Sequence, residues 1–187
     1  LLGLFLLAQF LGIAVLHNYI DTEKSAETGK TEFKDLPIGE RPPVEEKTSY
    51  VPIIFAILIG TVLLLLLIKY QLTWVWKIWF LLAVLVTLTV SLASFMPLLP
   101  AVIISFIAGF WKVFKPNVLI HTTTELFVYG GLAAIFVPIL NILSVSVLLI
   151  LIAIYDAYAV WKSKHMVTLA KSQIESKVFA GLLIPYQ

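Results

Sequence analysis

Two carboxylates lie inside apolar runs of this sequence, Asp156 and Glu125. Asp156 follows the run SVSVLLILIAI, and the first cation after it is Lys162. At 1.5 Å of rise per residue, this spacing places Asp156 roughly 9 Å inside the end of a membrane helix. A carboxylate at that depth costs on the order of 2–3 kcal/mol or less, and intramembrane acids mark functional sites by default. Asp156 is therefore the first candidate for chemistry, with a bundle contact or interfacial hydration as the structural alternative.

The other polar groups near apolar runs have plainer interpretations. Glu125 follows HTTT and is expected to be structural, either hydrated or bonded to Thr122 or His121, although a cavity-facing position stays open. Tyr155 and Tyr158 flank Asp156, and position alone favours an interfacial aromatic belt for both. The three histidines are expected to be interfacial, since they lie at or near predicted membrane edges: His17, His121 and His165.

Several chemistries are excluded by inspection. The sequence has no cysteine, no His-Glu-x-x-His zinc motif, no Gly-x-Ser-x-Gly nucleophile motif and no glycine-rich phosphate loop. We therefore expect no metal and no cofactor. The net charge of +2 forms no basic stripe, so a nucleic-acid partner is not expected.

The groups above lie in or beside apolar runs of about twenty residues. That is the length of a helix that crosses a hydrocarbon core of roughly 30 Å, so membrane helices must position them. The chain is 60% hydrophobic with a mean hydropathy of +1.01. This pattern predicts an all-α, polytopic membrane protein with the bilayer as its solvent. Gly130, Gly131 and Ala134 provide the small-residue spacing at which membrane helices approach closely. The six predicted spans are 1–20, 51–69, 73–95, 98–114, 118–138 and 140–162.

Charge predicts the orientation of these spans. The polar segment 21–50 carries eight acids and five bases and has too little apolar content for a core of its own. Lys69 lies at the connection between the second and third spans, and Lys112 at the connection between the fourth and fifth. Lys162 lies at the end of the sixth span. The positive-inside rule then places the N-terminus in the cytoplasm and segment 21–50 outside.

The chain after the sixth span is different in character. Residues 164–179 alternate apolar and polar side chains at helical spacing, which predicts an amphipathic helix too polar to span. Its apolar stripe would be Met166, Leu169, Ala170, Ile174 and Val178. The predicted organisation is thus a six-span domain at 1–162 and a cytoplasmic-side amphipathic segment at 163–187.

The stretch YDAYAV resembles the sixth-helix Tyr-Asp motif of the presenilin and signal peptide peptidase family of intramembrane aspartyl proteases. WKSKHMVTLAKSQIESKVFAGLLIPY, the basic and amphipathic stretch that follows, is similar to the family's layout, and HTTTELFVYGGLAAIFVPIL looks like its fifth span. The short loops and the lack of cysteine look like an archaeal presenilin homologue. The resemblance implies that Asp156 is catalytic, that Tyr155 shapes the site, and that the substrates are transmembrane peptides in the cell membrane.

One departure limits this resemblance. The family's second catalytic aspartate lies in a Gly-x-Gly-Asp motif, and this sequence contains no such motif and no second intramembrane aspartate. Aspartyl proteolysis needs two carboxyl groups that share a proton. We therefore interpret the chain as the N-terminal half of such a protease, inactive alone and completed by a C-terminal half carrying that aspartate.

Two other functions remain open from the residues alone. A proton-coupled transporter or channel would use Asp156, with Glu125 as a second relay group, and would show inverted repeats. A non-enzymatic membrane scaffold would use the acid to satisfy a neighbour.

Overall fold

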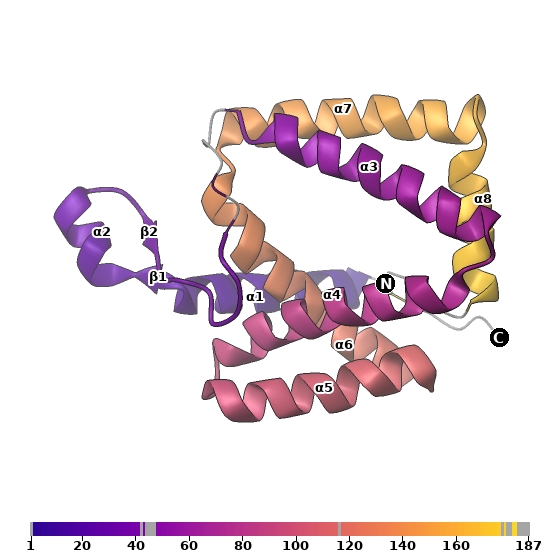
Figure 1. The fold of residues 1–187 in the computed structure, drawn as a ribbon. Coiled ribbons are helices and arrows are strands. Elements are labelled where there is room, and N and C mark those ends of the chain that lie inside the picture. Colours follow the sequence, from indigo (N-terminus) through magenta and orange to yellow (C-terminus); the bar gives the residue numbers. More distant parts are fainter. Residues whose placement is uncertain are drawn as a thin grey trace. The chain divides into compact units, whose positions relative to one another are not determined.

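Helices dominate the computed structural model, which describes residues 2–41, 43, 48–115, 117–176, 178 and 181–182 (Figure 1). This agrees with the predicted all-α class. The helices are α1 Leu2–Asn18, α2 Thr22–Thr28, α3 Tyr50–Lys69, α4 Thr73–Ala93, α5 Leu98–Phe114, α6 Val118–Phe136, α7 Ile142–Trp161 and α8 His165–Glu175. Two short strands, β1 Ile20–Asp21 and β2 Glu32–Phe33, lie between α1 and α3, and a 3₁₀ turn at Val137–Ile139 follows α6.

Each predicted apolar stretch contains one long helix, but the helices differ in length. Four candidate spans in the described residues are long and apolar enough to cross a membrane. The helices α1 and α5 have 17 residues each, which is about 26 Å at 1.5 Å per residue. That is slightly short of a core of roughly 30 Å, so six spans stay a prediction. The four candidates are Tyr50–Lys69, Thr73–Ala93, Val118–Ile139 and Ile142–Trp161.

The chain forms two compact units. The first unit contains Leu1–Arg41, Phe80–Pro138 and Ala180–Gln187, and the second contains Pro42–Trp79 and Ile139–Phe179.

In the first unit, α1 and α6 pack along one another around a small apolar core. Val15, Tyr19, Val90 and Ala134 form this core, and all four are buried. The Tyr19 hydroxyl donates a hydrogen bond of 2.8 Å to the Val90 carbonyl oxygen, which joins the end of α1 to α4. A buried phenol needs such a partner, because an unsatisfied polar group inside an apolar core is costly.

Two adjacent glycines let the helices of this unit approach closely. A Cβ atom at Gly131 would overlap the backbone carbonyl of Thr87 on α4. At Gly130 a Cβ atom would lie 3.0 Å from Val15 Cγ2 and 3.1 Å from Ser91 Oγ. Together with the fully buried Ala134, these contacts confirm the predicted small-residue packing of this stretch.

The polar segment after α1 is folded rather than extended. Strands β1 and β2 pair antiparallel in the register Ile20↔Phe33 and Asp21↔Glu32. The Asp21 side chain caps α2 by accepting a hydrogen bond from the Lys24 amide, and Gly29 ends α2 with a φ of +67°. Left-handed backbone of this kind favours glycine. In the described part of the segment, α2 buries no residue, and Phe33 packs on the core of the first unit.

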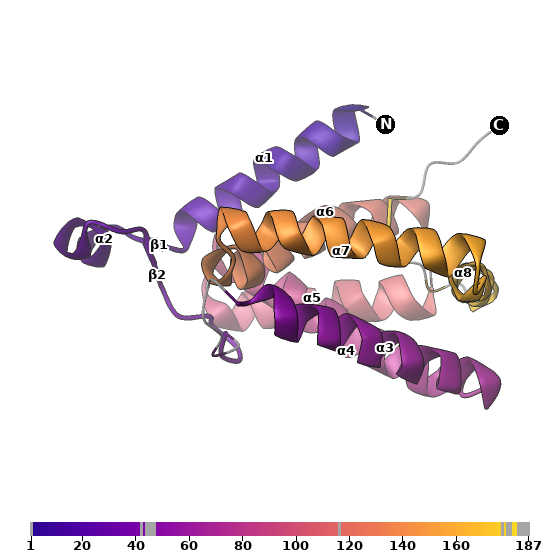
Figure 2. The same cartoon turned by 90° about the horizontal axis from the view of Figure 1, so that it is seen from above.

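In the second unit, α7 lies beside α3, and α8 contacts both helices (Figures 1 and 2). The prediction of an amphipathic helix at 164–179 is only partly met by α8. Leu169 is buried, but Ile174, which belongs to the predicted apolar stripe, is 67% exposed. Leu169 of the predicted stripe thus packs inside the unit and Ile174 does not, and the amphipathic role of this segment stays a prediction. Residues 177, 179, 180 and 183–187 of the predicted segment lie outside the described residues.

Candidate active site

Asp156 lies near the C-terminal end of α7, which has clear local start and stop signals. The helix begins after Asn141, whose side chain accepts a 2.7 Å hydrogen bond from the Ser144 amide. This cap satisfies one of the amides that a helix start leaves unpaired. The helix ends at Trp161, and Lys164 then adopts a left-handed backbone with φ +55° before α8 begins. The turn at Lys164 therefore returns the chain toward the end of α7.

One face of α7 is packed and the opposite face is open. Asp156 is half-buried at the edge of the packed face. No hydrogen bond or ion pair within the described residues involves its carboxylate. The packed stripe is Ser144, Leu148, Ile152, Tyr155 and Ala159, and the exposed side chains include Leu149, Ile150 and Ile154.

Tyr155, the neighbour of Asp156, is tied to two other helices. Its hydroxyl donates a 3.1 Å hydrogen bond to Thr61 Oγ1 on α3. The same oxygen lies 3.0 Å from His165 Nε2 at the start of α8, and the two ring centroids are 5.7 Å apart. Position alone favours an aromatic-belt role for this tyrosine, and the structure instead shows it in a polar network inside the second unit.

An apolar groove runs between α3 and α7 beside these residues. Its volume is about 330 Å³, and Tyr155 and Tyr158 belong to its wall. Because almost all of its lining is aliphatic or aromatic, the groove suits apolar surface rather than a charged ligand. The remaining lining residues are Ile54, Ile57, Leu58, Leu151, Ile152 and Ile154.

Glu125 belongs to a separate buried cluster in the first unit. Its Oε1 atom accepts a hydrogen bond from Lys112 Nζ at 2.5 Å, and His121 Nε2 lies 3.9 Å away. The side chains of all three residues are nearly inaccessible to solvent. His121 Nε2 is also 2.8 Å from the carbonyl oxygen of Gly181, which fixes that residue against α6. The direct partner of Glu125 is thus Lys112, which the sequence did not suggest, and a structural role for Glu125 stays a prediction.

The position of Lys112 corrects one expectation. The sequence suggests a loop cation at the membrane edge, but Lys112 is 2% exposed and neutralised by Glu125. His121 is likewise buried, with 3% of its surface exposed, and its position at the membrane edge stays a prediction. The physical reason is that a buried carboxylate without a partner is costly, and pairing with a cation offsets part of its lost hydration. A lone acid within an apolar run was the only signal in the sequence that such a partner was needed.

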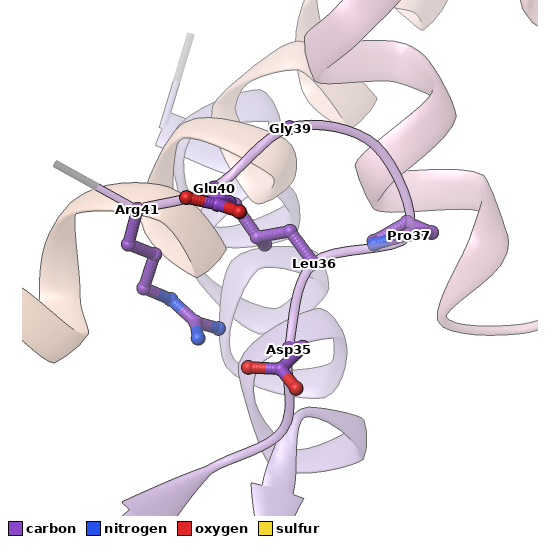
Figure 3. A pocket seen from close by; sticks show the side chains of 6 residues that line it. All are labelled: Asp35, Leu36, Pro37, Gly39, Glu40 and Arg41. Carbon is purple, nitrogen blue, oxygen red and sulfur yellow. The ribbon is translucent and has the colours of Figure 1, made fainter.

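A larger hollow of about 710 Å³ lies in the polar segment of the first unit, along residues 35–41 (Figure 3). Figure 3 shows Arg41 directed toward the side of Asp35. Burial lowers the pKa of the Arg41 guanidinium, and the Asp35 carboxylate opposes this shift. Among the described residues, Arg41 Nε and Nη2 have no hydrogen-bond partner. One cation, Arg41, and the carboxylates of Asp35 and Glu40 belong to the wall of this hollow.

The sequence pointed to Asp156 and Tyr155 but missed the residues that hold Tyr155. Thr61 and His165 lie 94 and 10 positions away from it, and neither separation follows a helical period. Glu125 and Asp156 belong to different units. No group of three or more His, Asp or Glu side chains in the described ranges is placed to hold a metal ion.

Comparison with known proteins gives one match. The family model described as signal-peptide peptidase, presenilin aspartyl protease matches residues 3–187. No curated protein and no solved structure matches the chain.

Proposed function

The chain belongs to the signal-peptide peptidase and presenilin family of aspartyl proteases, and on this premise we propose that Asp156 is one of two catalytic aspartates of an intramembrane protease. One observation carries the proposal. Asp156 follows Tyr155 on an apolar helix long enough to span a membrane, half-buried and without an intramolecular partner in the described residues. The family and the four candidate spans also indicate a multi-pass membrane protein.

The proposed chemistry needs two carboxyl groups that share one proton. The ionised group activates a water molecule for attack on the scissile carbonyl carbon, while the protonated group polarises the carbonyl oxygen. The other two aspartates of this chain, Asp21 and Asp35, lie in the polar segment after α1. A segment carrying the Gly-x-Gly-Asp aspartate therefore completes the site, and these 187 residues alone are inactive.

The membrane arrangement is part of the same proposal. Residues 1–162 form a six-span domain with a cytoplasmic N-terminus, segment 21–50 lies outside, and 163–187 lies on the cytoplasmic side. Water reaches Asp156 from that side, and the substrate is a transmembrane helix that unwinds locally to expose its amide. Tyr155 shapes the site. The apolar groove beside Tyr155 supports a substrate of this kind.

The rival functions have weaker support. A relay through Glu125 needs a group that exchanges protons readily, whereas Glu125 is buried and bonded to Lys112. A scaffold would give Asp156 a neighbour to satisfy, and none engages it within the described residues. Family membership also favours a protease over both.

The test is cleavage of a model transmembrane peptide by the complete protein, with both halves present in detergent or vesicles. Asp156→Asn keeps the size of the side chain but cannot ionise, so we expect cleavage to fall to background while expression and thermal stability stay normal. Asp156→Ala should behave in the same way. This chain without the segment that carries the second aspartate should also show background cleavage.

Asp35→Asn is the matched control, because it removes an aspartate of the polar segment by the same substitution. It should cleave at the wild-type rate. Retained cleavage in Asp156→Asn would sink the assignment, and cleavage by these 187 residues alone would contradict the two-aspartate scheme.

A further inference from the structure

Polar side chains from three elements of the second unit meet at one phenol oxygen. The Tyr155 hydroxyl on α7 lies 3.1 Å from Thr61 Oγ1 on α3 and 3.0 Å from His165 Nε2 on α8. The other imidazole nitrogen, His165 Nδ1, lies 2.5 Å from Ser163 Oγ. Among the described residues, the bonds of the Tyr155 hydroxyl link α7 directly to α3 and to α8.

The direction of each bond follows from the number of protons available. The Thr61 hydroxyl donates to the Ile57 carbonyl oxygen at 2.9 Å, so its oxygen accepts from Tyr155. Tyr155 has one hydroxyl proton and gives it to Thr61. The Tyr155 oxygen must then accept from His165, which requires a proton on Nε2. With that proton on Nε2, Nδ1 is an acceptor. The Ser163 hydroxyl also lies 3.4 Å from the carbonyl oxygens of Tyr158 and Ala159, and its shorter contact of 2.5 Å assigns its proton to Nδ1.

This chain of bonds fixes the rotation of α7 about its own axis. Apolar contacts are non-directional, and membrane helices gain no hydrophobic driving force from packing on one another. Hydrogen bonds weaken steeply when they are misaligned. Asp156 is the next residue along α7, about 100° around the helix from Tyr155. Because no bond of its own orients the Asp156 carboxylate in the described residues, its direction depends on how α7 is held.

We propose that His165 is a positioning residue that acts through Tyr155: its Nε2–H group holds the Tyr155 hydroxyl against Thr61 and so sets the direction in which Asp156 is presented. The inference rests on the proposed function of Asp156. In the described residues no hydrogen bond or ion pair joins His165 to Asp156, so its effect is on the orientation of the helix rather than on the chemical step. The left-handed turn at Lys164 brings the imidazole back to Tyr155.

The decisive experiment compares two amide substitutions of His165. The side-chain amide of Gln reaches the position of Nε2 and can still donate to Tyr155, whereas the shorter Asn reaches only the position of Nδ1. In the complete protein, His165→Gln should keep kcat within about threefold of wild type. His165→Asn should lower kcat by about tenfold or more with KM little changed, as expected for the loss of one hydrogen bond of ordinary strength.

Two further variants test the rest of the chain of bonds. Tyr155→Phe and Thr61→Val remove the hydroxyl groups with little change of shape, and each should lower kcat to a similar extent. The double variant His165→Asn/Tyr155→Phe should be no slower than Tyr155→Phe alone, because both substitutions remove the same hydrogen bond between His165 and Tyr155. His17→Asn is the matched control, since His17 is exposed and its substitution should leave kcat unchanged.

NMR of nitrogen-labelled histidine on this chain gives a readout that does not depend on activity. The signal that disappears in His165→Gln should have the signature of an imidazole with a proton on Nε2, and Tyr155→Phe should shift it. A proton on Nδ1 instead would overturn the proposal. Equal losses of kcat in the Gln and Asn variants would also overturn it, as would wild-type kcat in both His165→Asn and Thr61→Val.

The same assay includes Asp156→Asn, so the two claims fail separately. Activity in Asp156→Asn would reject the catalytic assignment, and the NMR result would still test the hydrogen-bonded chain. An inactive Asp156→Asn beside fully active His165→Asn and Thr61→Val would reject only the positioning role.

Discussion

Lys112 and Glu125 place opposite charges between α5 and α6, where each residue is only 2% exposed. Lys112 Nζ also lies 5.7 Å from the centroid of the Phe80 ring, which adds a cation–π contact. Burial of an ion pair is expensive, but burial of one unpaired charge is worse, since nothing offsets its lost hydration. The pair therefore stabilises the packed unit only as long as both partners are present.

We expect Glu125→Gln to lower the free energy of unfolding by about 3–5 kcal/mol, the usual effect of removing one partner of a buried pair. Lys112→Met should have a similar effect, because it leaves the Glu125 carboxylate without its cation. The double variant Lys112→Met/Glu125→Leu replaces the pair with apolar side chains and should recover most of the loss. Thermal unfolding in detergent measures all three.

Lys115→Met is the control for this cycle, because Lys115 is a nearby cation that is exposed. It should change the stability little, as exposed charges usually do. Losses that simply add in the double variant would contradict a direct interaction between Lys112 and Glu125.

At this scale the sequence identified the acids but not their surroundings. Asp156 stands out because an acid in an apolar run is rare, and the Tyr-Asp pair gives it a specific role by resemblance. Lys112 does not stand out, because a lysine at the end of an apolar run usually belongs to the membrane edge. Its burial depends on where α6 places Glu125, which no local pattern records.

At the level of elements, α4 and α6 meet at Gly131 with backbone against backbone. A Cβ atom there would overlap the carbonyl group of Thr87, a rigid neighbour that has no rotamer to change. The small-residue spacing in the sequence predicted such an approach, but it did not indicate which helix would be the partner.

We expect Gly131→Ala to destabilise the protein by about 1–3 kcal/mol, the usual effect of overpacking. Gly60→Ala is the control, because Gly60 lies on α3 with open space where the new methyl group would go. Alanine forms helices better than glycine, so the control should be neutral or slightly more stable. Thermal unfolding of both variants in one detergent checks this, and equal stability would argue against close contact of α4 and α6.

The amphipathic segment shows the limit of periodicity as a guide. The spacing of apolar residues correctly predicted a helix near 164–179, and α8 occupies His165–Glu175. It did not predict that Leu169 is buried while Ile174 is exposed. A periodic pattern gives the face of a helix that prefers burial, but the elements packed against the helix decide which residues are covered.

At the level of the whole molecule, the positive-inside rule predicts that segment 21–50 and α8 lie on opposite sides of the membrane. The chain contains no cysteine, so single cysteines can report accessibility without background. We expect Thr31→Cys to react with a membrane-impermeant maleimide added outside intact cells. Thr168→Cys should react only after the membrane is permeabilised. Both residues are exposed, and neither substitution changes the charge.

A control variant with a cysteine in the middle of a candidate span, Gly60→Cys, should stay largely unlabelled in both conditions, because lipid excludes the reagent. Labelling of Thr31→Cys and Thr168→Cys from the same side would contradict the six-span arrangement. Labelling of Thr168→Cys alone in intact cells would reverse the predicted orientation.

The residue pattern was enough to identify a helical membrane protein, to single out Asp156 as the acid to examine, and to show a resemblance to a family that the comparison then confirmed. Hydropathy, helix length and a two-residue motif are local properties, so they can be read along the chain. The contact partners become visible only in the folded chain: Tyr155 with Thr61 and His165, Lys112 with Glu125, and Gly131 with Thr87. These contacts join residues up to 94 positions apart. Which residues meet therefore depends on how whole helices pack.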